Sequence, residues 1–429
     1  MIDLKPPSKP STGTTGMRSL DVEIERARER GQRSGTSTLV AVAGLTMAVV
    51  VIVINVTGVF APAPPPVEPA TNTRTNRPAA DAPAPPPSTI PPLPFALREP
   101  DAPDAMWNGH DLSKTPPDKL TETIRDAMAA RDAPVAAQLQ YWAIHNGQVG
   151  GMLNMAELMS ALGDADATLW WITQCAIKEG FAPDWLEDSY PVLRKDTRLP
   201  ALRTWLTTCQ AYWRAHPVLT TPIVVPEGYD GSRKIPTVFW LHGHGSDPNL
   251  VGPMVTNLAN ALDIAFVGIS GTDTIGPIRF GWSRDCARNW QRVQQGLTEA
   301  LATHKLKPTR LILFGFSAGA QTALDLLVRH PDAVGGAIAL SPGADGGAQY
   351  ADLPTTPDLA RCFAVIGVGS EEHPGNKALA KLGVDTLTGW GAQVVAPVFA
   401  GGRHSLPAGF MELFPTWVRE IESHAKLRE

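Results

Sequence analysis

Cysteine is scarce in this sequence, and its placing argues against two common kinds of site. The 429 residues include four cysteines, which stand far apart: Cys175, Cys209, Cys286 and Cys362. None forms a C-x-x-C pair, so neither a zinc ribbon nor thioredoxin chemistry is indicated. His242 and His244 lie close together, but no carboxylate or third histidine follows at a ligand spacing. We therefore predict no metal site and no cofactor.

An excess of charge of one sign is also lacking. Lysine and arginine number 37 against 42 aspartates and glutamates, and the net charge is −5. Without a basic stripe, nucleic acid is not an expected partner, and no long acidic run indicates an acidic tail. Hydrophobic residues make up 43% of the chain, enough for a packed core, and the length suggests two or three units.

One long uncharged run is present, from Leu39 to Phe60. As a helix its 22 residues would span roughly 30 Å, the thickness of a bilayer core, so a single transmembrane helix is predicted over 39–60. The polar segment 1–38 is longer than the polar region that usually precedes the apolar run of a cleaved signal peptide. This favours an uncleaved anchor.

The basic residues around this run predict its orientation. Five arginines precede it (Arg18, Arg26, Arg28, Arg30 and Arg33), and two follow within twenty residues (Arg74 and Arg77). This bias places segment 1–38 in the cytoplasm and the rest of the chain outside it, in the periplasm if the source is a bacterium.

Proline marks the next segment. Fifteen of the 40 prolines fall within residues 61–105, among short alanine, threonine and asparagine stretches. Such a composition favours extended backbone without a core, so we predict a disordered linker that holds the folded part off the membrane.

Residues 106–218 are predicted to form a small helical domain, because apolar residues recur there at three- and four-residue spacings. Within it, the stretch "NMAELMSALGDADATLWWITQCAIKEGF" resembles a tetratricopeptide-type helical hairpin. The resemblance implies a structural module or, as the alternative, a surface for a protein partner. Two disulfides, Cys175–Cys209 and Cys286–Cys362, are one prediction for an extracytoplasmic chain; four buried thiols are the other.

Residues 219–429 show short apolar runs that alternate with helical patterns, which predicts an α/β domain with a doubly wound, mostly parallel sheet. The predicted strands are "TVFWLHG", "IAFVGIS", "RLILFGF", "GAIALS", "CFAVIGVG" and "VVAPVFA".

Between a predicted strand and a predicted helix, Gly315-Phe316-Ser317-Ala318-Gly319 fits the pattern G-x-S-x-G. A sharp turn at this place lifts a serine hydroxyl out of the sheet, and glycines permit the close backbone approach that the turn needs. Ser317 is therefore the predicted nucleophile.

On these residues and on "LHGHGSDP", the chain resembles the α/β-hydrolase superfamily over roughly residues 220–425. It looks most like the small carboxylesterase and phospholipase-like or polyester-depolymerase-like members. The resemblance implies a late histidine as general base. His404 in "FAGGRHSLP" follows the last predicted strand and takes that role.

The superfamily also implies a carboxylate after a strand that ends in G-x-x-D, and here this chain departs from the pattern. Its "VIGVGSEEH" places Glu372 in that position, with Glu371 and Asp345 as the alternatives. Glutamate can hold the imidazole as aspartate does.

An acyl-transfer site also needs backbone donors for the oxyanion. Ala318 is expected to provide one of them, and His244 or Gly245 the other. Phe280 and Trp282 are predicted either to line the substrate pocket or to pack in the interior.

The leading hypothesis is a membrane-anchored serine hydrolase that cleaves carboxylic esters or thioesters through an acyl-enzyme. Its expected substrate is a small or lipid-like ester. Two alternatives remain open: a peptidase or acyltransferase with the same nucleophile, and an inactive scaffold that binds a protein partner at the membrane. Only the unusual acid position supports the scaffold.

Overall fold

The computed structural model describes residues 89–249, 253–343, 348, 350, 353, 355–407 and 409–426. Within these ranges no helix has the length and apolarity needed to cross a bilayer. The predicted cytoplasmic segment 1–38 and the predicted transmembrane helix 39–60 lie outside them, so both stay predictions.

Helices fill the first part of the described chain, after a short pair of antiparallel strands, β1 (Met106–Trp107) and β2 (His110–Asp111). They are α2 (Pro117–Ala129), α3 (Ala133–His145), α4 (Met152–Ala161), α5 (Ala165–Lys178), α6 (Leu186–Ser189) and α7 (Leu199–Ala215). We call α2–α7 the helical part. Asp132 and Asp164 cap α3 and α5 by accepting backbone N–H bonds. Large side chains such as Trp171 and Tyr190 are fully buried between the helices.

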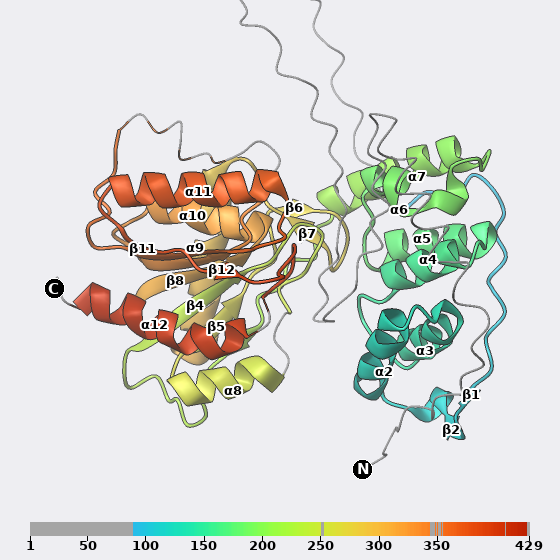
Figure 1. Cartoon of the computed structure of the whole chain (residues 1–429), viewed down its shortest axis with the longest axis horizontal. Helices are drawn as coiled ribbons and strands as arrows, with labels where there is room; N and C mark the ends of the chain where they lie inside the picture. Colours follow the sequence, from blue (N-terminus) through green and yellow to red (C-terminus); the bar gives the residue numbers. More distant parts are fainter. Residues whose placement is uncertain are drawn as a thin grey trace, which may run out of the picture. The chain divides into compact units, whose positions relative to one another are not determined.

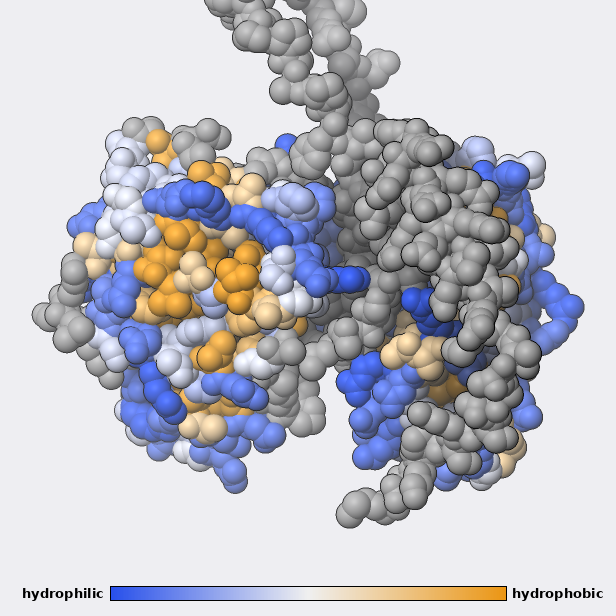
Figure 2. Space-filling model, viewed as in Figure 1, coloured by the Kyte–Doolittle hydropathy of each residue, from blue (hydrophilic) through white to orange (hydrophobic). Residues whose placement is uncertain are grey.

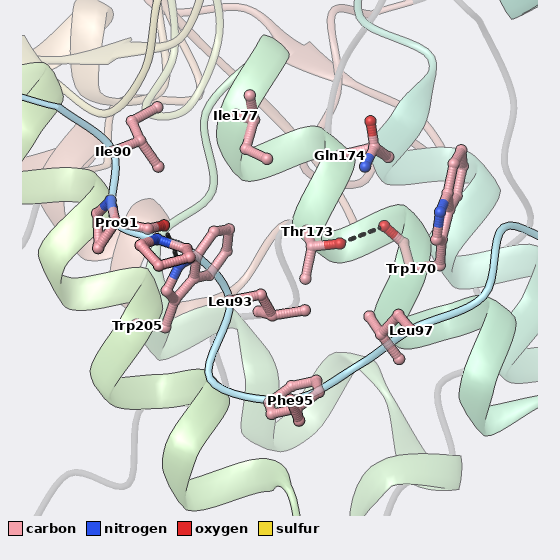
Figure 3. A pocket seen from close by; sticks show the side chains of 11 residues that line it. Ile90, Pro91, Leu93, Phe95, Leu97, Trp170, Thr173, Gln174, Ile177 and Trp205 are labelled. Carbon is pink, nitrogen blue, oxygen red and sulfur yellow. Dashed lines mark hydrogen bonds between the residues drawn. The ribbon is translucent and has the colours of Figure 1, made fainter.

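The segment 89–105 packs against the helical part, which corrects the prediction of an unpacked linker through residue 105. Its apolar side chains are partly buried against the core of the helical part: Ile90, Leu93, Phe95 and Leu97. The Trp205 indole donates a hydrogen bond to the Pro91 carbonyl at 2.9 Å. In Figure 3 these side chains line a pocket of about 490 Å³ together with residues of α5 and Trp205 of α7.

All four cysteines lie in the described chain, and none forms a disulfide. The two predicted disulfides are therefore wrong, and the alternative of four buried thiols is correct. Burial raises the pKa of the Cys209 thiol to about 12, so a neutral thiol is the stable form of this side chain at physiological pH.

The second part is built on one sheet with the strand order β11-β10-β9-β8-β4-β5-β3. We call β3–α12 the sheet part. Its strands are β3 (Ile223–Val224), β4 (Ile235–Leu241), β5 (Ala265–Gly268), β8 (Pro308–Phe316), β9 (Val334–Leu340), β10 (Phe363–Gly369), β11 (Gln393–Val395) and β12 (Val398–Phe399), which pairs with β10. All pairings are parallel except that of β3 with β5. The predicted doubly wound, mostly parallel sheet is confirmed.

Helices cover both faces of this sheet (Figure 1). The helices α9 (Cys286–His304), α10 (Ala318–Arg329) and α11 (Pro374–Gly389) pack on one face, and α8 (Pro253–Leu262) and α12 (Phe410–Lys426) on the other. Two separate core clusters of apolar residues fill the two interfaces. Burial on both faces explains why β8, β9 and β10 are continuous apolar runs in the sequence.

Apolar side chains remain exposed at one edge of the sheet part. Figure 2 shows a hydrophobic area in the region that Figure 1 labels β11 and β12. Val395 and Val398, one on each of these strands, are 39% and 67% exposed. Because β11 and β12 are short, this edge offers few unpaired backbone groups to another strand.

Candidate active site

The turn between β8 and α10 holds Ser317 in an unusual backbone conformation. Its φ of 54° and ψ of −122° lie in a region that residues with a side chain rarely adopt. Three hydrogen bonds fix the turn: the Ser317 N–H donates to the Leu340 carbonyl, and the Ser317 carbonyl accepts from the N–H groups of Gly343 and Gln321. This geometry lifts the hydroxyl away from the sheet at the carboxyl ends of the strands, as the G-x-S-x-G pattern predicts.

Glycine is required on both sides of the serine because backbone atoms approach closely there. A Cβ on Gly315 would overlap the Gly319 carbonyl, and a Cβ on Gly319 would overlap the Leu241 carbonyl. We therefore expect Gly319→Ala to lower the free energy of unfolding by about 2 kcal/mol or more, as for overpacked sites.

Urea denaturation measures this effect, with Gly389→Ala as the matched control. Gly389 lies at the end of α11, and a Cβ there would meet no atom within 4 Å. The control should be neutral or stabilising by up to about 1 kcal/mol. Equal stability of the two variants would contradict the close approach at the turn.

His404 lies between β12 and α12, and its ring contacts Ser317. The distance from His404 Nε2 to Ser317 Oγ is 2.9 Å, and the ring lies beside that of Phe316 with centroids 5.1 Å apart. His404 Nδ1 is 3.1 Å from each carboxylate oxygen of Glu372. With Nδ1–H donating to the carboxylate, Nε2 is left to accept the serine proton.

Glu372 follows β10 and is only 3% exposed. Its Oε1 also accepts bonds from the His373 N–H at 2.8 Å and from Asn376 Nδ2 at 3.1 Å. Burial acts to raise the pKa of Glu372, but the bonds from His404 and from His373 outweigh it and hold that pKa below its ordinary value. The carboxylate is thus ionised at neutral pH, and the stability it contributes is lost as the pH falls through its lowered pKa.

The first alternative acid, Glu371, has a partner other than His404. Glu371 is exposed and pairs with Arg403 at 3.1 Å. Asp345 lies outside the described residues. The structure therefore brings Ser317, His404 and Glu372 together, and Glu372 is the residue that the G-x-x-D pattern places in the acid position.

Asn376 is a site residue that the sequence analysis missed. It lies in the first turn of α11, and its amide holds the Glu372 carboxylate, as described above. The signal available in the sequence was its spacing of four residues from Glu372 at the start of a predicted helix. That spacing alone does not separate it from any other polar helix residue.

The backbone donors around Ser317 differ in their availability. The Gly245 N–H donates to the Phe280 carbonyl at 2.8 Å, so it is not available to an oxyanion in this conformation. The His244 N–H has no acceptor within the described part of the chain. Ala318 is the first residue of α10, where a helix leaves its N–H groups unpaired. Ala318 and His244 are thus the remaining candidates, and Gly245 is not.

His242 supports the loop that carries His244. The side chain is fully buried, its Nδ1 lies 2.7 Å from the Gly243 carbonyl oxygen, and its Nε2 accepts from the Gly271 N–H at 3.0 Å. Burial lowers the pKa of His242 to about 4, so the ring is neutral and can make both bonds. No cluster of three or more potential metal ligands occurs in the described ranges.

The two aromatic residues predicted for the pocket have different surroundings. Phe280 is 1% exposed and lies in the packed interior, so it offers no surface to a substrate. Trp282 is partly buried, and its indole N–H donates to the His242 carbonyl at 2.7 Å. The pocket role is wrong for Phe280 and stays a prediction for Trp282.

Chemically, this arrangement can carry out acyl transfer. An imidazole held by a carboxylate can take the proton from a serine hydroxyl, which is otherwise a weak nucleophile at neutral pH. Two backbone N–H groups beside the serine can stabilise the negative charge that develops on a carbonyl oxygen.

Comparison with known proteins agrees with this chemistry. Residues 219–360 match the family model described as putative esterase. The matched range contains Ser317 and ends before Glu372 and His404. No protein among the curated ones matches the chain.

Several solved structures are similar to about half of the chain. A carboxylesterase of Bacillus cereus is 19% identical, with a TM-score of 0.38 and coverage of 49% of this chain and 99% of its own. A carboxylesterase of Mesorhizobium loti is 21% identical, with a TM-score of 0.37 and coverage of 47% and 95%. A fluorophosphonate-binding serine hydrolase of Staphylococcus aureus is 12% identical, with a TM-score of 0.34 and coverage of 48% and 94%.

Proposed function

We propose that this chain, whose sheet part is a serine esterase domain of the α/β-hydrolase type, hydrolyses carboxylic esters through an acyl-enzyme on Ser317. His404 acts as general base and Glu372 holds its imidazole. The observation that carries the proposal is the continuous contact from Ser317 Oγ to His404 Nε2, and from His404 Nδ1 to the Glu372 carboxylate.

The reaction runs in two steps. Ser317 Oγ attacks the ester carbonyl while His404 takes its proton, and the oxyanion is held by the N–H groups of Ala318 and His244. His404 then gives the proton to the departing alcohol, which leaves an acyl group on the serine. In the second step His404 deprotonates a water molecule, which attacks the acyl carbon. The bond to Ser317 Oγ then breaks, His404 returns the proton to that oxygen, and the acid is released.

The Glu372 contact weakens the inactive-scaffold alternative, because the unusual acid position was its only support. A thioester or an amide would react through the same groups, and an acceptor other than water could take the acyl group. Assays therefore have to identify both the bond that is cleaved and the acyl acceptor. The likeness of the helical part to a tetratricopeptide hairpin stays a prediction, as does its role for a protein partner.

A short-chain aryl ester and a fluorophosphonate probe test the proposed function on the full chain. We expect time-dependent release of the phenol and stoichiometric covalent labelling by the probe. A folded chain that does neither would overturn the proposal. A parallel assay with an aryl thioester and an aryl amide ranks the three acyl bonds.

We further propose that the chain is anchored by residues 39–60, with the esterase domain on the extracytoplasmic side. The uncharged run and the arginine bias support this. In intact bacterial spheroplasts, added protease should cut the esterase domain of the membrane-bound chain. Protection of that domain in sealed spheroplasts, and its digestion only after lysis, would overturn the orientation.

A further inference from the structure

A buried ion pair joins the helical part to the esterase domain. Arg279 Nη2 lies 2.9 Å from Glu179 Oε2, and the two side chains are only 3% and 4% exposed. Charges removed from water in this way are costly unless each is paired and hydrogen-bonded. A pair that links residues one hundred positions apart in the sequence therefore constrains the segments that carry them.

Both side chains make further bonds to the backbone. Arg279 Nη1 donates to the Gly245 carbonyl at 3.1 Å, and Nη2 donates to the Gly150 carbonyl at 3.2 Å. Glu179 Oε1 accepts from the Met152 N–H at 3.1 Å. The pair thus ties the start of α4 to the loop that contains His244 and Gly245.

Arg279 belongs to a hairpin formed by β6 (Asp273–Thr274) and β7 (Phe280–Gly281), and this hairpin contacts both sides. At its turn, Ile275 is 1% exposed and belongs to the core cluster of the helical part. Along β7, the Phe280 carbonyl accepts from the Gly245 N–H, and the Phe280 N–H donates to the Ser246 carbonyl at 2.9 Å. The hairpin therefore connects the core of the helical part, through direct contacts, to the loop that contains His244.

The backbones of the two parts also approach closely beside the ion pair. A Cβ on Gly180 would lie 2.6 Å from the Gly276 Cα, and the Ile278 N–H donates to the Glu179 carbonyl at 3.3 Å. Next to this contact, the buried Trp185 ring meets the His244 ring edge to face, with centroids 6.3 Å apart. His244 itself is thus contacted by the helical part.

From these contacts we propose that Glu179 and Arg279 are positioning residues for ester hydrolysis. They fix the Gly245 carbonyl, and with it the neighbouring His244 N–H, where the oxyanion forms. The helical part is then a structural component of the active site. This inference rests on the proposed function, because it assigns a support to the same site.

Glu179→Gln is the first test, made in the full chain. Glutamine keeps the size of the side chain but removes the charge that pairs with Arg279. Because the oxyanion is present in the tetrahedral intermediate and its flanking transition states but not in the bound ester, we expect kcat to fall by roughly tenfold with KM nearly unchanged. This is less than the loss of about 10²–10³-fold on removal of an oxyanion donor itself, because the N–H stays in place but is less well held.

Arg279→Lys tests the other partner. Lysine keeps the positive charge beside Glu179. Its single ammonium cannot reproduce the planar fork that reaches Gly245, Gly150 and Glu179 together. We expect the same pattern, a fall in kcat with KM nearly unchanged. Should Glu179→Gln fail to fold, Arg279→Lys carries the same test.

Asp196→Asn is the matched control. Asp196 pairs with Arg198 at 2.7 Å inside the helical part, so its loss removes an arginine–carboxylate pair without touching the loop. Melting temperatures are measured for all variants, and rates at a temperature where each is folded. The control should keep the wild-type kcat.

The inference is overturned if folded Glu179→Gln and Arg279→Lys both keep the wild-type kcat, or if Asp196→Asn loses as much of it. A wild-type chain that neither hydrolyses the ester nor reacts with the fluorophosphonate would instead overturn the proposed function. The two failures are thus distinguished by the wild-type assay.

Discussion

Ser317→Ala is expected to lower the rate of aryl ester hydrolysis by about 10⁶-fold, the loss seen when the nucleophile of a serine triad is removed. The reason is that the only hydroxyl in contact with His404 Nε2 within the described chain is that of Ser317, at 2.9 Å. Covalent labelling by a fluorophosphonate should disappear in the same variant. Initial rates and gel fluorescence measure the two effects.

The fold should survive this change, because alanine fits the space of a half-buried serine. A melting temperature close to that of the wild type is therefore the control for Ser317→Ala. If the folded variant kept more than a small fraction of the wild-type turnover, another residue would be the nucleophile and the account of the site would fail.

Glu372→Gln is expected to lower kcat by about 10⁴-fold, as when the acid of a serine triad becomes an amide. An amide can donate to His404 Nδ1, which stabilises the tautomer with its proton on Nε2. That tautomer cannot accept the Ser317 proton. Steady-state kinetics with the aryl ester measure the loss.

Glu371→Gln is the matched control for this prediction. Glu371 is the preceding residue, but its side chain is 53% exposed and pairs with Arg403 on the surface. Wild-type kinetics are expected, because surface pairs of this kind contribute little. If Glu371→Gln were the inactive variant and Glu372→Gln the active one, the acid would be misassigned.

The sheet and the place of the nucleophile could be predicted because both are local patterns. Continuous apolar runs indicate strands buried on two faces, and G-x-S-x-G between a strand and a helix indicates the turn at Ser317. The choice between Glu371 and Glu372 is not local. The Glu371 N–H donates to the Gly402 carbonyl while Arg403 holds its side chain outward, which leaves Glu372 to face His404.

The choice of the second oxyanion donor could not be predicted from local sequence either. His244 and Gly245 are adjacent and equally suited by sequence. Only the bond from Gly245 to the Phe280 carbonyl, 35 residues later, takes Gly245 out of consideration. The pair Glu179–Arg279 was beyond sequence reasoning, because one hundred positions separate the two residues and no sequence pattern links them.

Composition misled the prediction at the linker. The prolines of residues 61–105 indicated an extended chain without contacts, and this outweighed the apolar residues between them. Extended backbone is compatible with packing, however. In the segment 89–97, side chains such as Leu93 and Phe95 lie against α5 and α7, although the chain forms no helix or strand there (Figure 3).

Mapping the site of fluorophosphonate labelling is the most direct test of the central claim. The full chain is reacted with the probe, digested, and its peptides are sequenced by mass spectrometry. The account predicts one modified residue, Ser317, because it is the hydroxyl activated by His404 and Glu372. A folded chain that carries the label on another residue, or takes up none, would contradict it.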